Sequence, residues 1–528
     1  MNKFYILLLL FGVLSCKKEE VEKKAKPIPK APTTAIKPEG KALAVDTILL
    51  TPFNSKTLKE FYMSSGYKTV WQSKKNRQII LKQLLDSEEE GLNPDDYKVS
   101  KLQKYEQRIA LMNDKEIVNY DILLTRNLQK YIAHLTTGKL NPRALYADWD
   151  LKEKKIDVNE TIANFFKGDS LAYTIEQLKP NHIAYIKLKK ALEIINSFPK
   201  DTFRKIEISN KIIPNDTNSV LINIKRRLIY WKDMKPKDSL SSIYDEESLE
   251  AIKKFQYRHG LSADGVIGKG TIQSLNFSKK QRKEQILANL ERWKWFPKEM
   301  GNEYVIVNIP DYKLTLVKDT DTMRTHKVIV GREKRKTPIL SSKLSNVVFN
   351  PTWTVPPTIL KEDVIPAITK NRNYLSQTNI KVYDRNGAIV SANDWKLSNA
   401  RSYRYVQSPG TFNSLGMVKI LFPNRFSVYL HDTNHRDYFT KSMRSLSSGC
   451  VRVENPLALT EYLLDDSTNW NLEKITETLH SEKTKQIRIK KETYVHILYW
   501  TAWSEKNKLI FRDDIYNLDA DLYKKLRS

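Results

Sequence analysis

Through the first part of the chain, apolar residues recur every three or four positions. This spacing is typical of amphipathic helices that pack on one face, and it predicts a mainly helical domain over residues 46–212. One predicted helix stops at Gly91, ahead of a turn at Asn93 and Pro94, and another stops at Gly138. The apolar positions that we assign to the core of this domain are Ile79, Ile80, Leu81, Leu84, Leu85, Ile122, Leu123, Leu124, Leu128, Tyr131, Ile132, Leu135, Tyr185, Leu188, Leu192 and Ile195.

Three consecutive acidic residues, Glu88, Glu89 and Glu90, follow the first of these helices. A short run of like charges is usually solvated. We therefore interpret the cluster as a solvated helix end and not as a set of catalytic carboxylates.

A shorter helical pattern occupies residues 213–278. Two helices carry apolar residues at helical spacing, and a third follows a turn at Asp264 and Gly265. The glycines near this turn do not follow the G-x-G-x-x-G spacing and no strand precedes them, which excludes a dinucleotide-binding loop. Over residues 279–302 the pattern predicts an amphipathic linking helix that ends near Pro297. We expect this helix to pack back onto the first domain.

From residue 303 the pattern changes to short β-rich runs, which predict a sheet-rich sandwich or barrel over residues 303–475. The succession of β-rich runs is interrupted at about residues 358–408, where we predict an inserted lid that includes a short helix. Residues 476–528 are interpreted as a C-terminal extension of this domain. The whole chain is therefore predicted to be a multi-domain α+β protein. The strand-like runs are residues 304–309, 313–317, 327–331, 345–349, 416–422 and 426–431.

The composition of the 528 residues, with 40% hydrophobic and 28% charged, excludes a multi-span membrane protein and a wholly disordered chain. The formal net charge of +28 predicts attraction to anionic polymers or membrane surfaces. This length suggests about three domains, so the chain does not depend on disulfides for a stable core.

The N-terminus has the features of a signal peptide over residues 1–15: Lys3, an apolar run over residues 4–14 and a small residue before Cys16. The run is too short to span a bilayer as a mature helix. Residues 13–16 resemble a bacterial lipobox, which implies cleavage before Cys16 and a lipid on its sulfur. Residues 16–45, rich in Lys, Glu, Pro and Ala, predict a disordered tether. We therefore expect a lipid-anchored, periplasm-facing envelope protein whose partners are the membrane and anionic envelope polymers, and no nucleic acid.

The second of the two cysteines, Cys450, has no disulfide partner if Cys16 is lipidated. His431 ends an apolar run upstream of it, and Arg452 follows it by two positions. A His base supplies the thiolate that a Cys nucleophile needs, and an Arg holds a substrate carboxylate or favours the thiolate. Gly449 permits an unusual turn, in which the backbone N–H groups of Gly449 and Cys450 form an oxyanion hole. No spacing of His or Cys residues is typical of a metal site, and we expect no cofactor.

The stretch from His431 to Arg452 resembles the catalytic signature of YkuD-type L,D-transpeptidases, in which a His, a spacer of under twenty residues and S-x-G-C-hydrophobic-R follow one another. Residues 255–276 resemble the small three-helix peptidoglycan-binding domain. The similarity to the large, lid-bearing transpeptidases runs from about residue 50 to the C-terminus. It implies a helical scaffold domain, a peptidoglycan-binding domain and a mainly-β catalytic domain with an inserted lid. The matching flanking stretches are residues 91–97, 350–357, 408–410, 413–416, 422–424, 429–433 and 499–503.

The chain departs from this family at Ser448, where many members have a His directly before Gly-Cys. Any role of that second His is absent or taken by another group. We expect the second ring nitrogen of His431 to meet a backbone carbonyl near Ser447 or Ser448.

The resemblance implies that Cys450 attacks the carbonyl after the third residue of a peptidoglycan stem and releases the terminal D-Ala. An amine on the third residue of a second stem then resolves the thioester and joins the two stems. Carbapenems are expected to acylate the same Cys. The alternative role of the two aromatic candidates, Tyr429 and Trp353, is packing in the core. The implied site consists of Cys450 and His431 as catalytic residues, with Arg452, Tyr429, Trp353 and Ser448 as substrate contacts.

Two other functions remain open. Water as the acceptor would make the protein an L,D-carboxypeptidase that uses the same site. A lipoprotein that binds glycan without catalysis would keep the small domain and the basic surface, and it would need no nucleophile. The intact set of His431, Cys450 and Arg452 argues against this last possibility.

Overall fold

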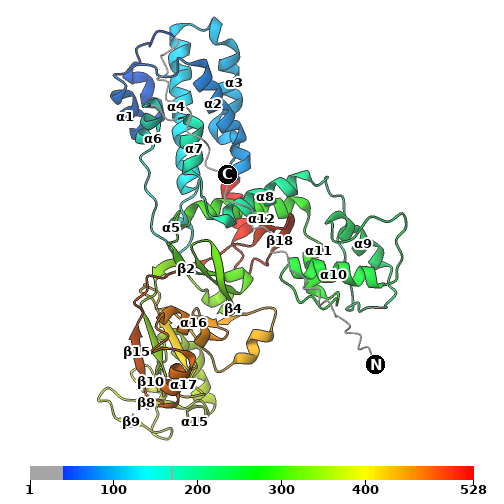
Figure 1. Ribbon diagram of the computed structural model, residues 1–528, viewed down its shortest axis with the longest axis vertical. Coiled ribbons are helices and arrows are strands. Elements are labelled where there is room, and N and C mark those ends of the chain that lie inside the picture. The colour runs from blue at the N-terminus through cyan, green and yellow to red at the C-terminus, as the bar shows by residue number, and fades with distance from the viewer. Residues whose placement is uncertain (1–39, 168–169) are drawn as a thin grey trace, which may run out of the picture.

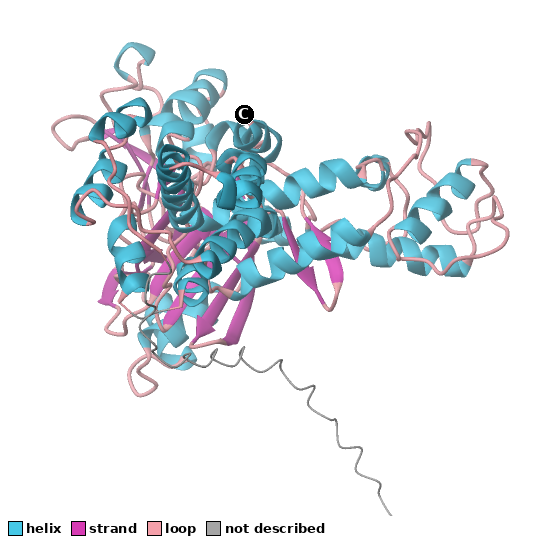
Figure 2. Cartoon of the chain, turned by 90° about the horizontal axis from the view of Figure 1, so that it is seen from above, coloured by secondary structure: helices cyan, strands magenta, loops and turns pink. Residues whose placement is uncertain are grey.

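The computed structural model describes residues 40–167 and 170–528. The predicted signal peptide, Cys16 and residues 16–39 of the predicted tether lie outside the described residues. Figure 1 shows a helical bundle at one end, a large sheet at the other and a small group of helices to one side. The view from above shows helices extending sideways from the part that holds the strands (Figure 2). The predicted multi-domain α+β class is confirmed. No helix in the described stretches is both long enough and apolar enough to cross a membrane.

The N-terminal bundle is built around the long helix α4 (Asp114–Thr137). A capping box at Asn113 and Glu116 starts this helix, and Gly138 ends it as predicted. Gly138 has a φ of 81°, and a Cβ there would lie 2.4 Å from the indole nitrogen of Trp295, so only glycine fits this approach. The other elements are η1 (Thr47–Phe53), α1 (Lys56–Ser64), α2 (Lys74–Leu85), η2 (Asp86–Glu90), η3 (Pro94–Tyr97), α3 (Val99–Arg108), η4 (Ile109–Leu111), α6 (Val158–Phe166) and α7 (Leu171–Leu178).

Glu90 contradicts the interpretation of the acidic cluster as a solvated helix end, because its side chain is buried with 1% exposed. Its carboxylate accepts a hydrogen bond from the Tyr185 hydroxyl at 2.7 Å and forms ion pairs with Lys189 at 2.5 Å and Lys179 at 3.0 Å. Burial alone would raise the pKa of Glu90, but the two lysines outweigh burial and lower it to about 2. The other two residues of the cluster are exposed as expected.

The predicted linking helix is α12 (Lys279–Trp295), which ends before Pro297. It was expected to be amphipathic, but every residue from Gln285 to Trp295 is buried. The reason is that α4, α8 (Ile183–Ser197) and α18 (Asp519–Arg527) all pack against it. The helix is therefore a central element of the fold, covered on all sides.

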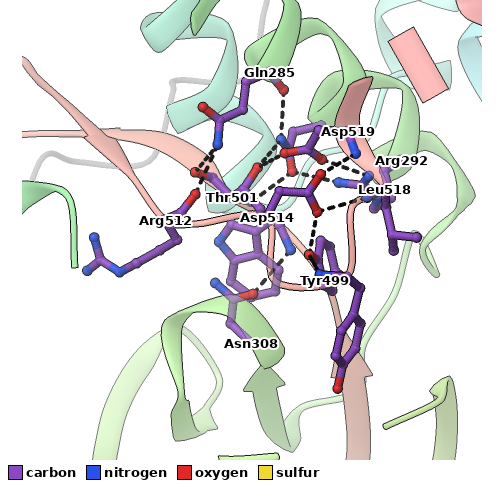
Figure 3. A network of polar contacts seen from close by, with 12 residues as sticks. Gln285, Arg292, Asn308, Tyr499, Thr501, Arg512, Asp514, Leu518 and Asp519 are labelled. Carbon is purple, nitrogen blue, oxygen red and sulfur yellow. Dashed lines mark hydrogen bonds and ion pairs between the residues drawn. The ribbon is translucent and has the colours of Figure 1, made fainter. Parts of the chain in front are cut away.

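A buried polar network ties the C-terminal segment to α12 (Figure 3). Arg292 pairs with Asp519 at 2.9 Å, and the Gln285 amide donates to the carbonyl of Arg512 at 3.0 Å. Buried polar groups need such partners, so these contacts fix the segment against the helix. The C-terminal segment contains the hairpin β17 (Ala502–Glu505) and β18 (Lys508–Phe511), followed by α18.

The small helical unit docks on this hairpin. Arg258 forms a buried ion pair with Asp233 at 2.5 Å and donates to the carbonyl of Leu509 at 3.2 Å. The ring of His259 stacks on Phe511 with centroids 5.6 Å apart. The three helices of the unit, which match the predicted pattern, are α9 (Val220–Tyr230), α10 (Glu246–Arg258) and α11 (Lys269–Leu275).

The main sheet has 12 strands, and its order runs β1-β5-β16-β2-β3-β4-β14-β12-β11-β6-β15, with β13 beside β4. The edge strand β1 follows α5, upstream of the small unit, and β15 and β16 come from the C-terminal extension. The elements of this region are α5 (Pro142–Leu145), β1 (Trp149–Asp150), β2 (Glu303–Asn308), η5 (Ile309–Asp311), β3 (Lys313–Lys318), β4 (Asp321–Gly331), η6 (Glu333–Arg335), β5 (Ile339–Lys343), β6 (Asn346–Phe349), β11 (Val418–Leu421), β12 (Leu430–His431), η9 (Arg436–Thr440), β13 (Ser445–Ser447), β14 (Val451–Val453), α16 (Pro456–Leu464), α17 (Leu472–His480), β15 (Lys485–Arg488) and β16 (Tyr494–Leu498).

The strand predicted over residues 426–431 is wrong over its first part, because β12 contains only Leu430 and His431. The Asn424 side chain accepts from the backbone N–H groups of Phe426 and Val428, both at 3.1 Å. Ser427 adopts a φ of 56°. These bonds close a tight loop, which replaces sheet pairing for these residues.

An insertion lies between β6 and β11 and includes residues 358–408, which the sequence predicts to be a lid; we refer to this insertion as the lid. It has a hydrophobic core of its own, which includes Val364, Ile368 and Trp395. Its four-stranded sheet has the order β7-β10-β8-β9 and is separate from the main sheet. The elements are β7 (Trp353–Thr354), α13 (Pro357–Ile359), the π-helix η7 (Leu360–Val364), α14 (Ile365–Lys370), α15 (Tyr374–Gln377), β8 (Ile380–Tyr383), β9 (Ile389–Val390), η8 (Leu397–Asn399) and β10 (Arg404–Gln407).

Candidate active site

Three neighbouring strands of the main sheet bring the predicted site residues together. β12 pairs antiparallel with β11 and parallel with β14, and the register places His431 opposite Lys419 on one side and opposite Arg452 on the other. Paired residues point to the same face of a sheet, and so do residues two apart along a strand. Lys419, His431 and Arg452 therefore form one row, and Tyr429 and Cys450 lie beside it on the same face.

The nucleophile candidate Cys450 follows a turn that requires glycine. Gly449 has a φ of 119°, and a Cβ there would lie 3.4 Å from the carbonyl oxygen of Lys336. The Thr337 hydroxyl donates to the carbonyl of Gly449 at 2.8 Å, and the Ser447 hydroxyl donates to the carbonyl of Cys450 at 2.6 Å. These bonds fix the turn, so the free thiol is held at the start of β14.

The Cys450 thiol is half-buried, and burial raises its pKa. Hydrogen bonds from the backbone and the hydroxyl of Tyr429 lower it in part, as do the charges of Lys419 and Arg452. The net result is a pKa above the ordinary value, so the thiol is protonated at neutral pH in the free protein.

The two aromatic candidates are linked to each other, and one of them contacts the thiol. Tyr429 packs edge-on against His431, with ring centroids 5.6 Å apart, and its hydroxyl hydrogen-bonds to Cys450. Trp353 comes from β7 at the base of the lid, and its indole hydrogen-bonds to the Tyr429 hydroxyl. Both side chains are half-buried, and Tyr429 is the one that contacts the thiol directly.

His431 is buried, with 5% of its surface exposed. Burial lowers its pKa to about 3, and the neighbouring charges of Arg452 and Lys419 act in the same direction. The backbone groups near its ring belong to Asp432 and Leu415. No hydrogen bond from the ring to a carbonyl of Ser447 or Ser448 occurs among the described residues, so the expected acceptor is not found there. Within the described chain, Nδ1 is buried without a hydrogen-bond partner of good geometry.

Arg452 and Lys419 are cations without acidic partners in the described part of the chain. Nε and Nη1 of Arg452 are buried and form no hydrogen bond there. The Lys419 ammonium lies over the Tyr429 ring, 4.5 Å from its centroid. Burial lowers the pKa of both groups, and in both cases the neighbouring Cys450 raises it. The site is therefore electropositive and suits an anionic ligand.

Ser448 contacts the lid through Arg335 and does not face the thiol row. The Arg335 guanidinium donates to the Ser448 hydroxyl at 3.0 Å. The same guanidinium pairs with Glu362 and Asp363 of η7, each at 2.5 Å. Ser448 is exposed, and one arginine thus joins the nucleophile turn to the lid.

The predicted oxyanion donors differ in their present contacts. The N–H of Gly449 donates to the Ser447 hydroxyl at 3.2 Å, so an oxyanion would have to compete with this bond. No hydrogen bond of the Cys450 N–H occurs among the described residues. The Cys450 N–H is therefore the better placed of the two donors.

Sequence reasoning missed Lys419 and Arg335. Lys419 stands between two apolar residues, and this alternation indicates a strand residue facing away from the core. Its position opposite His431 depends on strand register, which the pattern does not reveal. Arg335 lies far from Cys450 in the sequence and carries no local signal. The part of the chain that the structure describes contains no group of three His, Cys, Asp or Glu residues that would hold a metal ion.

Three family models match this chain. Residues 56–192 match the "Scaffold domain", residues 217–275 match the "Putative peptidoglycan binding domain", and residues 302–476 match the "L,D-transpeptidase catalytic domain". Three regions of the chain are therefore similar, in this order, to a scaffold domain, a peptidoglycan-binding domain and an L,D-transpeptidase catalytic domain. The resemblance drawn from the sequence motifs is confirmed.

A curated relative from Haemophilus influenzae, named "Putative L,D-transpeptidase", is 35% identical over 291 residues, which are 54% of this chain and 58% of the relative. The chain thus matches less than two thirds of that relative's length. Two solved L,D-transpeptidase structures are also similar. The one from Xylanimonas cellulosilytica is 13% identical and covers 55% of this chain and 98% of its own, with a TM-score of 0.18. The one from Stackebrandtia nassauensis is 14% identical and covers 54% and 97%, with a TM-score of 0.21.

Proposed function

We propose that this protein is an L,D-transpeptidase that cross-links peptidoglycan stems through an acyl-enzyme on Cys450. One observation carries the proposal: a free thiol, the base candidate His431 and an Arg452 guanidinium with unpaired nitrogens share one face of the sheet. This arrangement supplies a nucleophile, a proton acceptor and a group that binds a carboxylate. The match of residues 302–476 to the catalytic domain supports the same reaction class.

In the proposed reaction, His431 takes the thiol proton while Cys450 Sγ attacks the carbonyl carbon of the third stem residue. The bond between this carbon and the nitrogen of the terminal D-Ala breaks, and the leaving amine receives the proton from His431. The amine of a third residue on a second stem then attacks the thioester. That amine gives its proton to His431, the C–S bond breaks and the thiol re-forms.

The charges of the free site support a proton transfer that accompanies attack. Because the pKa of His431 is about 3 and that of Cys450 is raised, the resting pair is a neutral imidazole and a neutral thiol. No hydrogen bond joins the two side chains within the described chain, so substrate has to bring the transfer path together. The Cys450 N–H and the nearby cations would stabilise the oxyanion that forms.

We also propose that Cys16 is lipidated after removal of residues 1–15, and that the protein faces the periplasm on the tether of residues 16–45. The signal-peptide features and the lipobox-like residues support this localisation. Cys16→Ser is expected to release the protein from the membrane fraction. Retention of this variant in membranes would contradict the anchor.

Intact-protein mass after incubation with a carbapenem tests the proposed function. The wild-type protein is expected to gain the mass of one carbapenem, because the thiolate opens the β-lactam ring and keeps all its atoms. Cys450→Ala is expected to gain nothing, and Met443→Ala, at an exposed position before β13, is the matched control that retains acylation. No adduct on the wild type would overturn the proposal and favour glycan binding without catalysis.

Product mass separates transfer from hydrolysis once acylation is established. Purified tetrapeptide stems are expected to yield cross-linked dimers with loss of one D-Ala per dimer. Shortened monomers without dimers would assign the protein as an L,D-carboxypeptidase.

A further inference from the structure

One loop, residues 331–337 between β4 and β5, donates a hydrogen bond to each of the three residues that directly precede Cys450. The donors and acceptors are the Arg332 N–H to the Ser447 carbonyl at 3.1 Å, the Arg335 guanidinium to the Ser448 hydroxyl at 3.0 Å and the Thr337 hydroxyl to the Gly449 carbonyl at 2.8 Å. Bonds at three consecutive positions hold that stretch of chain in one conformation. The position of Cys450 therefore depends on loop 331–337.

The contact of Thr337 sets the direction of the better placed oxyanion donor. The Gly449 carbonyl and the Cys450 N–H belong to one peptide group, which is planar and trans, so the two groups point in opposite directions. The hydroxyl that holds the carbonyl therefore also holds the N–H. Gly449 needs such a constraint, because a glycine with a φ of 119° has wide conformational freedom.

The loop is closed by one side chain of the C-terminal extension. The Tyr516 hydroxyl donates to the Gly331 carbonyl at 2.7 Å and accepts from the Thr337 N–H at 3.0 Å, so it bridges the two ends of the loop. The Thr337 hydroxyl also accepts from the Gly331 N–H at 2.8 Å. Both Tyr516 and Thr337 are buried. Removal of the Tyr516 hydroxyl would therefore leave two buried backbone groups without a partner, which weakens the closure of the loop.

Tyr516 is anchored in turn to the polar network that joins the C-terminal segment to α12 (Figure 3). Its N–H donates to the Tyr499 hydroxyl at 3.1 Å, and the two rings stack with centroids 5.5 Å apart. The Tyr499 hydroxyl donates to the Asp514 carboxylate at 2.5 Å. The same carboxylate accepts from the N–H of Asp519, which pairs with Arg292 of α12. A continuous chain of buried contacts thus runs from α12 to the turn before Cys450.

Resting on the proposed function, we propose that Tyr516 is a positioning residue for the acylation of Cys450. Its hydroxyl holds loop 331–337 closed, and Thr337 of that loop aims the Cys450 N–H at the oxygen of the attacked carbonyl. Both residues act through the turn before the nucleophile. Tyr516 lies beyond residues 302–476, which match the catalytic domain, so the C-terminal extension completes the oxyanion site of that domain.

The experiment compares two reactions of the same thiol by intact-protein mass. Acylation by a carbapenem, measured at several concentrations, forms an oxyanion at the attacked carbonyl, whereas alkylation by iodoacetamide displaces iodide and forms none. Tyr516→Phe is expected to lower the maximal acylation rate on the order of 10- to 100-fold, with the half-saturating concentration and the alkylation rate unchanged. Tyr523→Phe, the same substitution on α18 of the same segment, is the matched control and is expected to keep both rates.

A pair of variants at Thr337 tests the other end of this path and decides the question even where Tyr516→Phe does not fold. Thr337→Val keeps the shape of the side chain and removes its hydroxyl, so it is expected to reproduce the selective loss of acylation. Thr337→Ser restores the hydroxyl and is expected to recover most of the acylation rate. A merely structural role would not produce this selectivity, because loss of folded protein reduces both reactions together.

Acylation at the wild-type rate in both Tyr516→Phe and Thr337→Val would overturn the inference. Equal loss of acylation and alkylation in these variants would overturn it as well, because it would indicate a role in folding or in exposing the thiol. Both results leave the proposed function intact. A wild-type protein that iodoacetamide alkylates at Cys450 but no carbapenem acylates would overturn the proposed function, and this inference with it.

Discussion

Glu90→Gln tests how a buried carboxylate joins the helical bundle to the rest of the protein. The substitution keeps the size of the side chain and removes its charge. Its carboxylate contacts Lys189 at 2.5 Å, Lys179 at 3.0 Å and the Tyr185 hydroxyl at 2.7 Å, and its backbone carbonyl accepts from Lys294 of α12. The loss is therefore expected to weaken the packing of α8 on the bundle through Lys189 and Tyr185, whereas the backbone contact to α12 is kept.

The magnitude follows from the pKa of Glu90, which burial raises but the two lysines lower from 4.5 to about 2. Because one pKa unit corresponds to about 1.4 kcal/mol, the ionised form stabilises the fold by about 3 kcal/mol. A depressed pKa means that this stability is fully present above pH 4.5 and is lost as the pH falls toward 2.

Urea unfolding followed by tryptophan fluorescence measures the effect. At pH 7, Glu90→Gln is expected to lose about 3 kcal/mol, whereas the exposed neighbour Glu89→Gln is expected to change the free energy of unfolding by less than about 0.5 kcal/mol. Between pH 4.5 and 3 the difference between the wild type and Glu90→Gln is expected to shrink. Equal stability of the two variants at pH 7, or a difference that grows on acidification, would refute this reasoning.

Three further predictions concern the site. Arg335→Gln breaks the link between the lid and Ser448 and is expected to lower the rate of Cys450 acylation about 10- to 100-fold, while Lys334→Gln, an exposed neighbour, leaves the rate unchanged. Gly449→Ala places a Cβ on a residue whose φ is 119°, and it is expected to cost about 1–3 kcal/mol in stability and to abolish acylation by a carbapenem. Acylation of this variant at the wild-type rate would contradict the strain. Alkylation of Cys450 by iodoacetamide is expected to accelerate through a midpoint above that of an ordinary exposed cysteine, because burial raises the thiol pKa, and a plateau already reached at pH 7 would indicate a resting thiolate.

Local patterns predicted the elements whose ends are determined by the nearby chain. Gly138 ends α4, and the predicted linking helix ends before Pro297. Most β-rich runs became strands, because β-branched residues and turns are local signals. The run at residues 426–429 failed, since the side chain of Asn424 captures the backbone groups that a strand would pair.

Burial of charged residues was the main error. Glu90 and the polar residues of α12 look like surface residues in the sequence, yet they are buried. Their partners come from α8, α18 and the C-terminal hairpin, far away along the chain. No periodicity within one helix contains this information.

The sequence by itself determined which chemistry is present: the order of the domains, a Cys after a Gly that the turn requires, and a His and an Arg at defined distances from it. The tertiary structure alone decided which side chains share the site. Strand register places Lys419 opposite His431 and Arg452 on its other side, and the packing of the lid brings Arg335 to Ser448. The physical reason is that a side chain's type is local, whereas its neighbours and its hydration depend on pairing between strands and domains that are distant in the chain.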